Sequence, residues 1–333
     1  MSTTVAAYQL VETDEGVRGR HTRIPLEDLG EGDVLIRVTH SSVNYKDGLA
    51  ATGRAPIARR LPLVGGCCAA GTVVEPGESG LPADTVVAVV GATLSEQHNG
   101  GYCEYLRVPA AWVVAVPEAF TSRQAAAIGT AGVTSAMAVV KLEDAGVTPE
   151  SGPIAVTGAS GGAGSLAVAL LAARGYEVTA LTGKPEAEDL LRDLGAANVA
   201  PRPDTSGTRL LERGTWAGAV DTVGGDTLAW LTRTVAPGGS IAAFGNAGGN
   251  RLTTTVLPFI LRGINLLGVT VTFPAAELRE RVWELLTSSL SREALDAIAT
   301  DVDFEDLDDA LRRIVTTGVV GRQVVRIGGE AAV

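Results

Sequence analysis

Cysteine, histidine and aromatic residues are scarce in this chain of 333 residues, and acidic residues outnumber basic ones. Three cysteines do not make a disulfide framework, and Cys67 and Cys68 are adjacent, so a bridge between them would strain the backbone. We therefore expect reduced thiols and a cytoplasmic protein. The formal net charge of −11 argues against a nucleic-acid or anionic-membrane surface, because phosphates would be repelled at long range.

Targeting and membrane-spanning signals are also missing. The first residues lack a basic stretch followed by an apolar run and a cleavage site, which argues against a signal peptide. Apolar runs such as 86–90 have the length of a strand, far below the roughly 20 residues that cross a bilayer. The composition is that of a large folded protein, with 46% hydrophobic residues and 41 glycines. The length favours two domains.

The first third of the chain predicts short strands joined by turns. Alternating or apolar stretches lie at residues 33–38, 71–77, 85–90 and 102–108, with glycine and proline between them. Strands of this length and spacing indicate a small, barrel-like β domain.

Strands and helices alternate in the rest of the chain. The segment Thr-Ser-Arg-Gln at 121–124 has the pattern of a capping box and predicts the start of a helix. Strands are expected at 154–157, 177–181, 219–223, 240–244, 265–269 and 321–327, and helices at 165–174, 186–194, 276–288 and 304–316. The βαβ order from residue 153 onward predicts a doubly wound parallel sheet.

The sharpest motif is the glycine-rich stretch 157–165, Thr-Gly-Ala-Ser-Gly-Gly-Ala-Gly-Ser. It follows an expected strand and opens an expected helix, so backbone N–H groups at the helix start would face a pyrophosphate. Glycine lets the backbone approach closely, because no Cβ stands in the way. Its spacing, Ala-x-Gly-x-x-Gly, departs from the strict nucleotide pattern, and the alternative is a tight turn without a ligand.

The next strand ends in Thr182, Gly183 and Lys184, with no acidic residue at its tip. An NAD-binding fold would place Asp or Glu there to bond the ribose 2′-hydroxyl. A hydroxyl, a bare backbone and a cation suit a 2′-phosphate instead, and Arg202 after the following strand offers a second cation. We therefore expect NADPH as the cofactor. The alternative is that both cations are solvated surface charges.

Several longer stretches are similar to one known family. They are 41–50 (Ser-Ser-Val-Asn-Tyr-Lys-Asp-Gly-Leu-Ala), 128–132, 142–147, 156–162, 216–224 and 253–262. Together they closely resemble the zinc-free acryloyl-CoA reductase (quinone oxidoreductase-like) branch of the medium-chain dehydrogenase/reductase family. The resemblance implies an α/β fold with a Rossmann-type doubly wound parallel sheet and a GroES-like β-rich catalytic domain. It implies a catalytic domain that begins at 1–122 and returns at 266–333, with the NADPH-binding domain at 123–265.

The resemblance also implies an activity and a set of site residues. The activity is NADPH-dependent reduction of the C=C bond of a short α,β-unsaturated acyl-CoA, without metal, by a homodimer. Tyr45 matches a tyrosine that lies against the cofactor. The other matched cofactor residues are Ser160, Gly161, Gly162 and Ala163 at the pyrophosphate, Thr182, Gly183, Lys184 and Arg202 at the 2′-phosphate, and Asn246 and Ile260 beside the nicotinamide.

Reduction of an activated alkene requires stabilisation of an enolate and a proton for the α carbon. The catalytic candidates are the Asn44 amide and the Tyr45 hydroxyl, although Tyr45 could equally pack against the nicotinamide and order it. Asp47 is a third candidate, which we interpret as more suited to capping or ordering the loop than to catalysis. A zinc site is not expected, because Cys67 and Cys68 stand where zinc enzymes of this superfamily carry His and Glu.

The substrate is less defined, because the pattern Pro-Gly-Ile-Asp is replaced by residues 65–68 and a Gly-Trp-Gly region by 91–99. Arg59, Arg60 and Arg262 are the candidate cations for the phosphates of coenzyme A. The alternatives are an NADPH-dependent reductase of quinones or free enones, and a non-catalytic NADPH-binding protein. The apolar stretch 264–271 is long for an exposed edge strand, so we expect two subunits to pair there.

Overall fold

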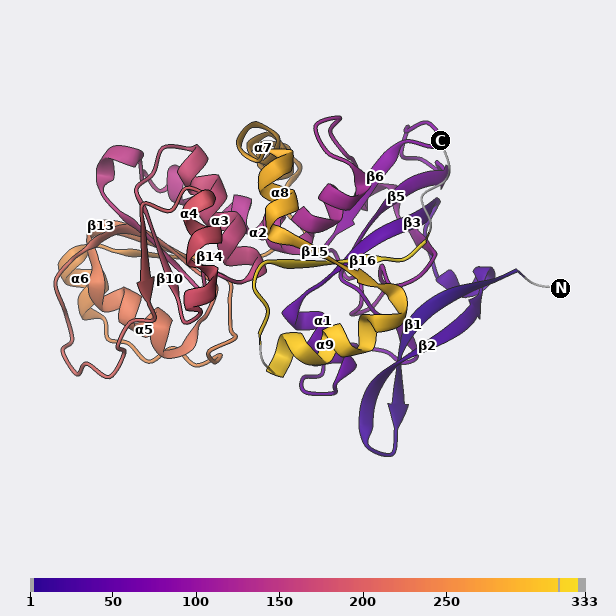
Figure 1. Cartoon of the computed structure of the whole chain (residues 1–333), viewed down its shortest axis with the longest axis horizontal. Helices are drawn as coiled ribbons and strands as arrows, with labels where there is room; N and C mark the ends of the chain where they lie inside the picture. Colours follow the sequence, from indigo (N-terminus) through magenta and orange to yellow (C-terminus); the bar gives the residue numbers. More distant parts are fainter. Residues whose placement is uncertain (1–2, 317, 329–333) are drawn as a thin grey trace. The chain divides into compact units, whose positions relative to one another are not determined.

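The computed structural model describes residues 3–316 and 318–328 (Figure 1). The chain divides into two compact units. The first, which we call the β-rich unit, contains residues 1–130, 271–273 and 299–333. The second, which we call the βαβ unit, contains residues 131–270 and 274–298.

A seven-stranded sheet and a three-stranded sheet form the β-rich unit. The larger sheet has the order β15-β16-β3-β5-β6-β8, with β7 also paired to β3, and the smaller has the order β2-β1-β4. The strands are β1 (Thr4–Thr13), β2 (Gly16–Pro25), β3 (Val34–Val43), β4 (Leu63–Val64), β5 (Cys68–Glu75), β6 (Val86–Val90), β7 (Tyr105–Val108), β8 (Val113–Ala115), β15 (Ala299–Asp303) and β16 (Arg322–Arg326). These strands confirm the predicted β-rich domain.

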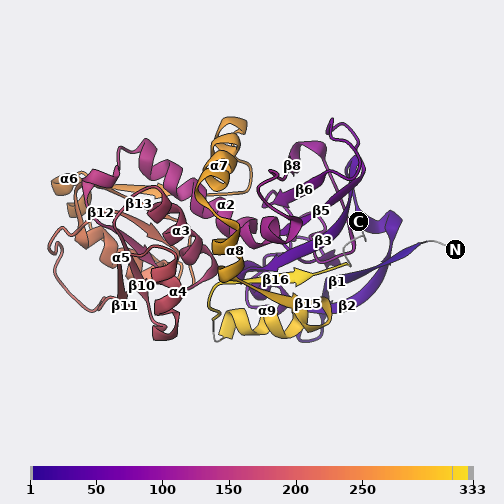
Figure 2. The same cartoon turned by 45° about the horizontal axis from the view of Figure 1, so that its top comes forward.

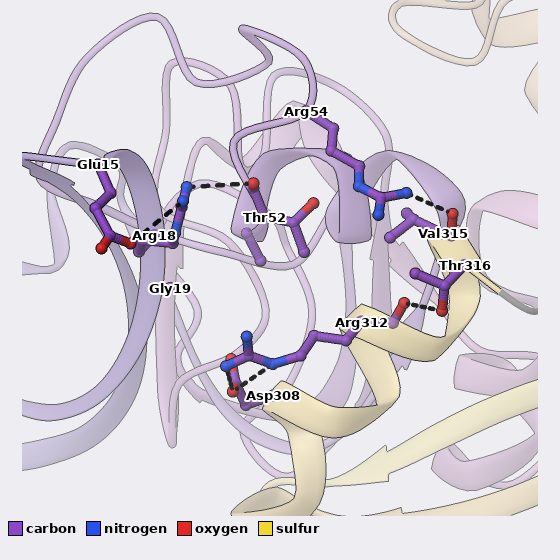
Figure 3. A pocket seen from close by; sticks show the side chains of 10 residues that line it. Glu15, Arg18, Gly19, Thr52, Arg54, Asp308, Arg312, Val315 and Thr316 are labelled. Carbon is purple, nitrogen blue, oxygen red and sulfur yellow. Dashed lines mark hydrogen bonds and ion pairs between the residues drawn. The ribbon is translucent and has the colours of Figure 1, made fainter.

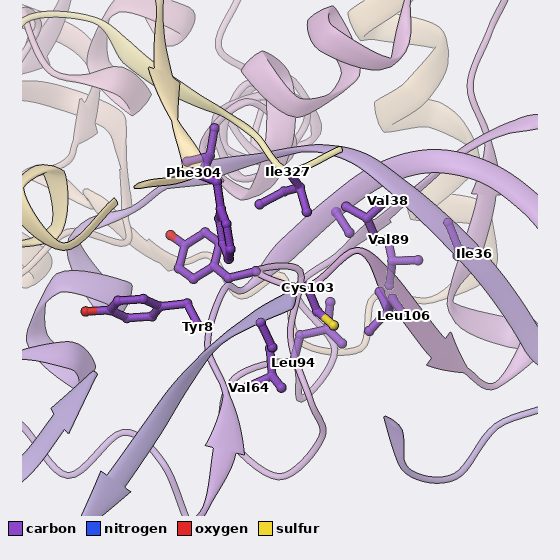
Figure 4. Packing of buried hydrophobic residues seen from close by; sticks show 14 of the residues in the cluster. Tyr8, Ile36, Val38, Val64, Val89, Leu94, Cys103, Leu106, Phe304 and Ile327 are labelled. Carbon is purple, nitrogen blue, oxygen red and sulfur yellow. The ribbon is translucent and has the colours of Figure 1, made fainter. Parts of the chain in front are cut away.

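Apolar side chains from both sheets form the core of the β-rich unit (Figure 4). Tyr8 of β1, Leu106 of β7 and Phe304 after β15 belong to one cluster. Helix α1 (Tyr45–Ala51) packs on helix α9 (Leu307–Thr316) at the side of this core. Gly48 permits this close approach, because a Cβ there would lie 2.7 Å from the carbonyl oxygen of Leu311.

The βαβ unit contains a six-stranded parallel sheet with the order β11-β10-β9-β12-β13-β14. Its strands are β9 (Ile154–Thr157), β10 (Val178–Thr182), β11 (Asn198–Pro201), β12 (Trp216–Asp221), β13 (Val235–Ala243) and β14 (Asn265–Gly268), and its helices are α3 (Gly162–Ala173), α4 (Glu188–Asp193), α5 (Gly225–Thr234), α6 (Leu257–Arg262), α7 (Ala276–Ser289) and α8 (Arg292–Ile298). The strand order extends outward in both directions from the β9–β12 pair. Right-handed crossovers therefore place α3 and α4 on one face and α5 and α6 on the other (Figure 2).

Helix α2 (Ser122–Asp144) begins at the predicted capping box. Thr121 N donates to Gln124 Oε1 at 3.0 Å, and Gln124 N donates to Thr121 Oγ1 at 3.2 Å. The helix is interrupted at Gly129, whose φ of 43° and ψ of −152° are not helical. Among the described helices, α2 alone has the length and composition of a membrane span, but 83% of that window is buried within the protein, as in a core helix.

The domain boundaries expected from the sequence differ from this division. The expected break at 122/123 falls at the start of α2, whereas the units divide at 130/131, next to the interruption of that helix. The expected return at 266 comes too early, because α7 and α8 pack against α3 and belong to the βαβ unit. The predicted edge strand at 264–271 is also shorter, since β14 ends at Gly268.

Candidate functional site

The glycine-rich loop between β9 and α3 has the backbone that a nucleotide site needs. Gly158 has a positive φ of 59°, and Gly161 N donates to Gly158 O at 2.9 Å, which closes a tight turn. A Cβ on Gly164 would lie 2.2 Å from Gly158 O, so only glycine lets the first turn of the helix approach the loop. Helix α3 starts at Gly162 without a side-chain cap. Its first N–H groups are therefore available to an anion.

Asp221 at the end of β12 anchors this loop, and the sequence analysis gave it no role. Its carboxylate is fully buried and accepts hydrogen bonds from the Thr157 hydroxyl at 2.6 Å and from Gly224 N at 2.8 Å. The Thr222 hydroxyl donates to Thr157 O at 2.8 Å. Burial raises the pKa of Asp221, and these donors oppose that shift. The ends of β9 and β12 are thus held together beneath the glycines.

Two cations, Lys184 after β10 and Arg202 after β11, lie beside the backbone of Gly183. Lys184 is partly buried, and Arg202 lies against Gly183, where a Cβ would come within 2.3 Å of Arg202 Nε. The pKa of Lys184 is lowered, first by burial and then by the charge of Arg202, with Glu186 opposing. Neither cation forms an ion pair among the described residues. Two like charges held near one glycine fit an anionic ligand such as a 2′-phosphate.

The remaining cofactor candidates lie elsewhere in the same unit. Ala163 is in the first turn of α3, where its carbonyl accepts a hydrogen bond from Ser135 at 2.8 Å. Asn246 is exposed in the loop after β13, and its carbonyl accepts from Gly249 N at 3.0 Å. Ile260 is on α6 with 68% of its surface exposed. The proposed nicotinamide role of Asn246 and Ile260 therefore stays a prediction.

In the β-rich unit, Asn44 and Asp47 form a capping box at the start of α1. The Asn44 backbone N–H donates to Asp47 Oδ2 at 3.1 Å, and the Asn44 side-chain amide donates to the same oxygen at 2.9 Å. Asp47 Oδ1 accepts from Cys67 N at 3.0 Å. Asp47 is buried, and burial raises its pKa while the Asn44 side chain and Lys46 oppose that change. The geometry matches the capping role that we favoured for Asp47.

Arg322 of β16 completes this cluster, and the sequence analysis did not single it out. Its guanidinium is buried and donates to Ala127 O at 2.9 Å, Val43 O at 3.2 Å, Asn44 Oδ1 at 3.1 Å and Ser42 Oγ at 2.6 Å. Both ends of the Asn44 amide are therefore engaged within the protein, so Asn44 is better suited to positioning than to binding an oxyanion. Tyr45 follows it as the first residue of α1, and its hydroxyl has no hydrogen-bond partner among the described residues.

Cys67 and Cys68 lie in the same cluster. Asn44 Nδ2 donates to Cys67 Sγ at 3.2 Å, and Cys68 Sγ lies 3.0 Å from Ser42 Oγ. The pKa of Cys67 is raised by its hydrogen bond to Cys68 and by burial. The pKa of Cys68 is lowered to about 6 by that hydrogen bond and by Ser42 and Arg322, against the effect of burial.

Two family models match parts of the chain, an alcohol dehydrogenase GroES-like domain at residues 30–118 and a zinc-binding dehydrogenase at 162–288. Acrylyl-CoA reductase AcuI of Ruegeria pomeroyi is 42% identical, over 92% of this chain and 93% of its own length. The protein named putative quinone oxidoreductase YhfP, from Bacillus subtilis, is 40% identical over 98% of this chain and all of its own. The chain belongs to the medium-chain dehydrogenase/reductase family.

Solved structures of the family agree with this assignment. The yhdH oxidoreductase of Salmonella enterica, determined with NADP, superimposes with a TM-score of 0.94 at 39% identity, covering 97% of this chain and all of its own. The Bacillus subtilis yhfP structure, which holds NAD, gives a TM-score of 0.91 at 40% identity, covering 98% of this chain and all of its own. The fold class predicted from the sequence is confirmed.

Zinc, which the description of one matching model mentions, does not fit this member of the family. Across residues 3–316 and 318–328, no group of three or more His, Cys, Asp or Glu side chains is arranged to hold a metal ion. Cys67 contacts the Asn44 amide nitrogen and the Thr130 hydroxyl, which are not zinc ligands, and its thiol donates to Asp47 Oδ2 at 3.4 Å. His98 is bonded to the Thr93 hydroxyl at 2.7 Å.

The cations proposed for coenzyme A have different surroundings. Arg262 was wrongly included, because its guanidinium donates to Arg233 O at 2.7 Å, to Val235 O at 2.9 Å and to Glu212 O. These hydrogen bonds cap the C-terminal end of α5 and leave the guanidinium without paired N–H donors for a phosphate. Arg59 and Arg60 are exposed, and of their guanidinium nitrogens only Nε of Arg60 is engaged by described residues, with Gln97 O at 2.6 Å.

A cavity of about 540 Å³ beside α1 and α9 contains three arginines (Figure 3). Arg18 donates to Thr52 O at 3.3 Å and Arg54 donates to Val315 O at 2.8 Å, so both satisfy carbonyls at helix ends. Arg312 is paired with Asp308. These cations are already engaged by the fold, and the cavity does not add a phosphate site.

Proposed function

We propose that this protein uses NADPH to reduce the carbon–carbon double bond of a short α,β-unsaturated acyl-CoA such as acryloyl-CoA. The observation that carries the cofactor choice is the pair of cations, Lys184 and Arg202, beside Gly183 where an NAD enzyme has an acid. NADP and NADPH complexes of relatives about 40% identical support it. Relatives named acrylyl-CoA reductase, 42% identical, support the substrate class.

When bound, NADPH supplies a hydride for the β carbon of the substrate. The chain must then stabilise negative charge on the thioester oxygen, which is the larger protein contribution to such a reaction. Tyr45 is our candidate for this task, because its hydroxyl is uncommitted at the start of α1. Asn44 and Asp47 act as positioning residues, since their polar atoms are bonded to each other and to Arg322 and Cys67.

Exposed cations support a coenzyme A carrier. Arg59 and Arg60 are adjacent on the surface of the β-rich unit, and the terminal nitrogens of Arg60 are not engaged by described residues. Guanidinium groups bind phosphates through paired N–H donors. Arg59 and Arg60 therefore suit the phosphates of coenzyme A. A free enone or quinone has no phosphate that these arginines could bind.

The test is oxidation of NADPH, followed by its absorbance, with acryloyl-CoA, crotonyl-CoA, a simple enone and a quinone as substrates. We expect turnover with the acyl-CoA substrates and a higher KM for them in Arg59→Ala/Arg60→Ala, with the enone unaffected. Tight NADPH binding without turnover of any alkene would support a non-catalytic NADPH-binding protein instead.

A quinone or free-enone reductase is the second candidate. It is favoured by the engagement of Arg262 within the protein, which leaves fewer cations for a carrier than the sequence suggested. The relative YhfP also has quinone oxidoreductase in its name. In that case turnover would be faster with the quinone, and the double arginine variant would not change it.

We also propose that two copies pair along β14. This strand is the edge of the parallel sheet, and the exposed apolar residues Val256, Ile260, Leu261 and Leu266 lie on it or on the adjoining segment around α6. An uncovered edge with such neighbours favours association. A light-scattering mass of one subunit at micromolar concentration would remove this proposal. Three free, buried cysteines support a reducing, cytoplasmic location.

A further inference from the structure

We propose that Cys68 is a buried thiolate that forms an ion pair with Arg322 and thereby positions the loop from Ser42 to Asp47 at the start of α1. Only 1% of the surface of Cys68 and 3% of that of Arg322 is exposed. Cys68 stands where the pattern Pro-Gly-Ile-Asp has its aspartate. A thiolate sulfur here takes the place of a carboxylate.

The hydrogen bonds around Cys68 are directed toward its sulfur. A guanidinium only donates, so Ser42 Oγ accepts from Arg322 Nη2 at 2.6 Å. The Ser42 proton is then left for Cys68 Sγ, 3.0 Å away. The Asn44 amide nitrogen, also only a donor, lies 3.9 Å from the same sulfur. Around Cys68, Arg322 thus fixes the Ser42 hydroxyl so that its proton can point at the sulfur.

The buried positive charge of Arg322 requires an anion close to it. Among described residues, its hydrogen-bond acceptors are two backbone carbonyls, an amide oxygen and a hydroxyl, which are all neutral. A buried guanidinium without an anion is costly. Asp47 is separated from it by the Asn44 amide, which accepts from Arg322 and donates to Asp47. Cys68 shares the Ser42 hydroxyl with Arg322 directly.

Other titratable groups near the sulfur do not provide that anion. The pKa values of Tyr102 and Cys67 are raised, so both stay protonated at neutral pH. Lys46 is paired with Glu96 at 2.7 Å, and that carboxylate is engaged there. The Asp47 carboxylate accepts hydrogen bonds from the Asn44 amide and from Cys67 N, so its charge is compensated by those donors rather than by Arg322. Of the acidic groups in the cluster, Cys68 alone has its pKa shifted toward the charged form.

The ion pair fixes the interruption of α2 as well as the start of α1. A Cβ on Gly129 would lie 2.8 Å from Ser42 Oγ, 3.1 Å from Arg322 Nη2 and 3.3 Å from Cys68 Sγ. The non-helical backbone of Gly129 therefore passes directly over the pair. Loss of the charge on the sulfur would leave Arg322 unpaired and loosen the contacts that orient Asn44.

The first test uses the native protein and does not depend on its activity. Ultraviolet absorbance of the thiolate is followed while the pH is lowered from mildly alkaline to mildly acidic, in the wild type, Cys68→Ser and Cys103→Ser. Cys103 is the matched control, because it is buried in the core with its pKa raised to about 11. We expect one thiolate in the wild type and in Cys103→Ser, lost with a midpoint near pH 6, and none in Cys68→Ser. A wild type without thiolate at neutral pH overturns the proposal.

The second test asks whether the charge positions the site, and it rests on the proposed function. We expect Cys68→Ser to lower kcat by between about tenfold and a hundredfold, the cost of misplacing a reactive group, with NADPH affinity unchanged. Cys68→Asp should restore kcat and move the acidic limb of the pH profile down by about one unit or more. Should Cys68→Ser not fold, rescue by Cys68→Asp still tests the charge. A Ser variant equal to wild type, or an Asp variant no better than Ser, overturns the positioning role.

Discussion

The Thr182 hydroxyl donates a hydrogen bond to Ser160 Oγ at 2.8 Å, which joins the tip of β10 to the glycine-rich loop. Lys184 N in turn donates to Thr182 Oγ1 at 3.1 Å, so the first cation of the expected 2′-phosphate site is oriented by the same hydroxyl. The pyrophosphate and 2′-phosphate portions of the candidate cofactor site are therefore one bonded structure.

The first prediction concerns cofactor choice. Lys184→Ala removes one charge-assisted contact, worth roughly 1.5–3 kcal/mol, so NADPH should bind about tenfold to a hundredfold more weakly. NADH has no phosphate there and should bind as before. Binding constants for both cofactors in wild type and variant check this. Arg202→Ala is the companion variant and should also act on NADPH selectively. Equal weakening of both cofactors would show that Lys184 does not recognise the phosphate.

A second prediction concerns Tyr45. If its hydroxyl stabilises the developing oxyanion, Tyr45→Phe should lower kcat by about a hundredfold, as loss of one such donor does, and leave NADPH affinity unchanged. Single-turnover rates and NADPH titration separate the two effects. A variant with normal kcat and normal NADPH affinity would show that the hydroxyl is not needed and that the ring only packs against the cofactor.

The third prediction uses the glycine at the interruption of α2. Gly129→Ala should lower the melting temperature more than Gly238→Ala. Both glycines have positive φ, 43° and 76°, but a Cβ meets nothing within 4 Å at Gly238. The control carries backbone strain without a clash, about 1–2 kcal/mol. The difference between the variants measures the contact with Ser42, Arg322 and Cys68 together with any additional strain of the Gly129 backbone. Equal losses in the two variants would show that the cluster tolerates the added methyl group.

The fourth prediction separates structural from ligand-binding arginines. Arg262→Ala should destabilise the fold by about 1–3 kcal/mol, because carbonyls of Glu212, Arg233 and Val235 lose their donor, and should not change KM for an acyl-CoA. Denaturant unfolding and steady-state kinetics on the same preparation check both halves. A raised KM with unchanged stability would return Arg262 to the carrier site.

The fifth prediction is the dependence of stability on pH. The pKa of Cys68 falls from an ordinary 9.0 to about 6 in the folded protein, so the folded state holds the thiolate where the unfolded chain is protonated. This contribution is complete above pH about 9, shrinks as the pH falls and is absent below about 6. Unfolding of wild type should therefore become harder from pH 6 to 9, relative to Cys68→Ser. Parallel curves for the two proteins would contradict it.

The sequence predicted those features that depend on neighbouring residues. The capping box of Thr121 and Gln124 is confirmed because its hydrogen bonds span three positions. The βαβ alternation and the turn at Gly158 are equally local, and both are present. Local patterns of this kind are set by backbone geometry and capping, which sequence spacing reveals.

Features that join distant residues were missed or misjudged. Arg322 meets Ser42 across 280 positions, and the last strand gives no local sign of a buried cation. In the sequence, Arg262 looks like an ordinary surface cation. In the folded chain, its guanidinium donates to backbone carbonyls of residues that are distant in the sequence. Cys67 and Cys68 could be recognised as a departure from a pattern, while the partners of their sulfurs could not.

The pairing of β16 with β3 has a consequence for synthesis. The chain emerges from the ribosome in order, and domains generally fold as units as they appear. All of the βαβ unit precedes residue 299, so its sheet can form while β15 and β16 are still untranslated. The β-rich unit cannot be completed before β16 is synthesised near the end of the chain. Until then, Ser42, Asn44 and Cys68 lack the guanidinium of Arg322. The nucleotide half can thus mature on the nascent chain, whereas the other half becomes competent only near termination.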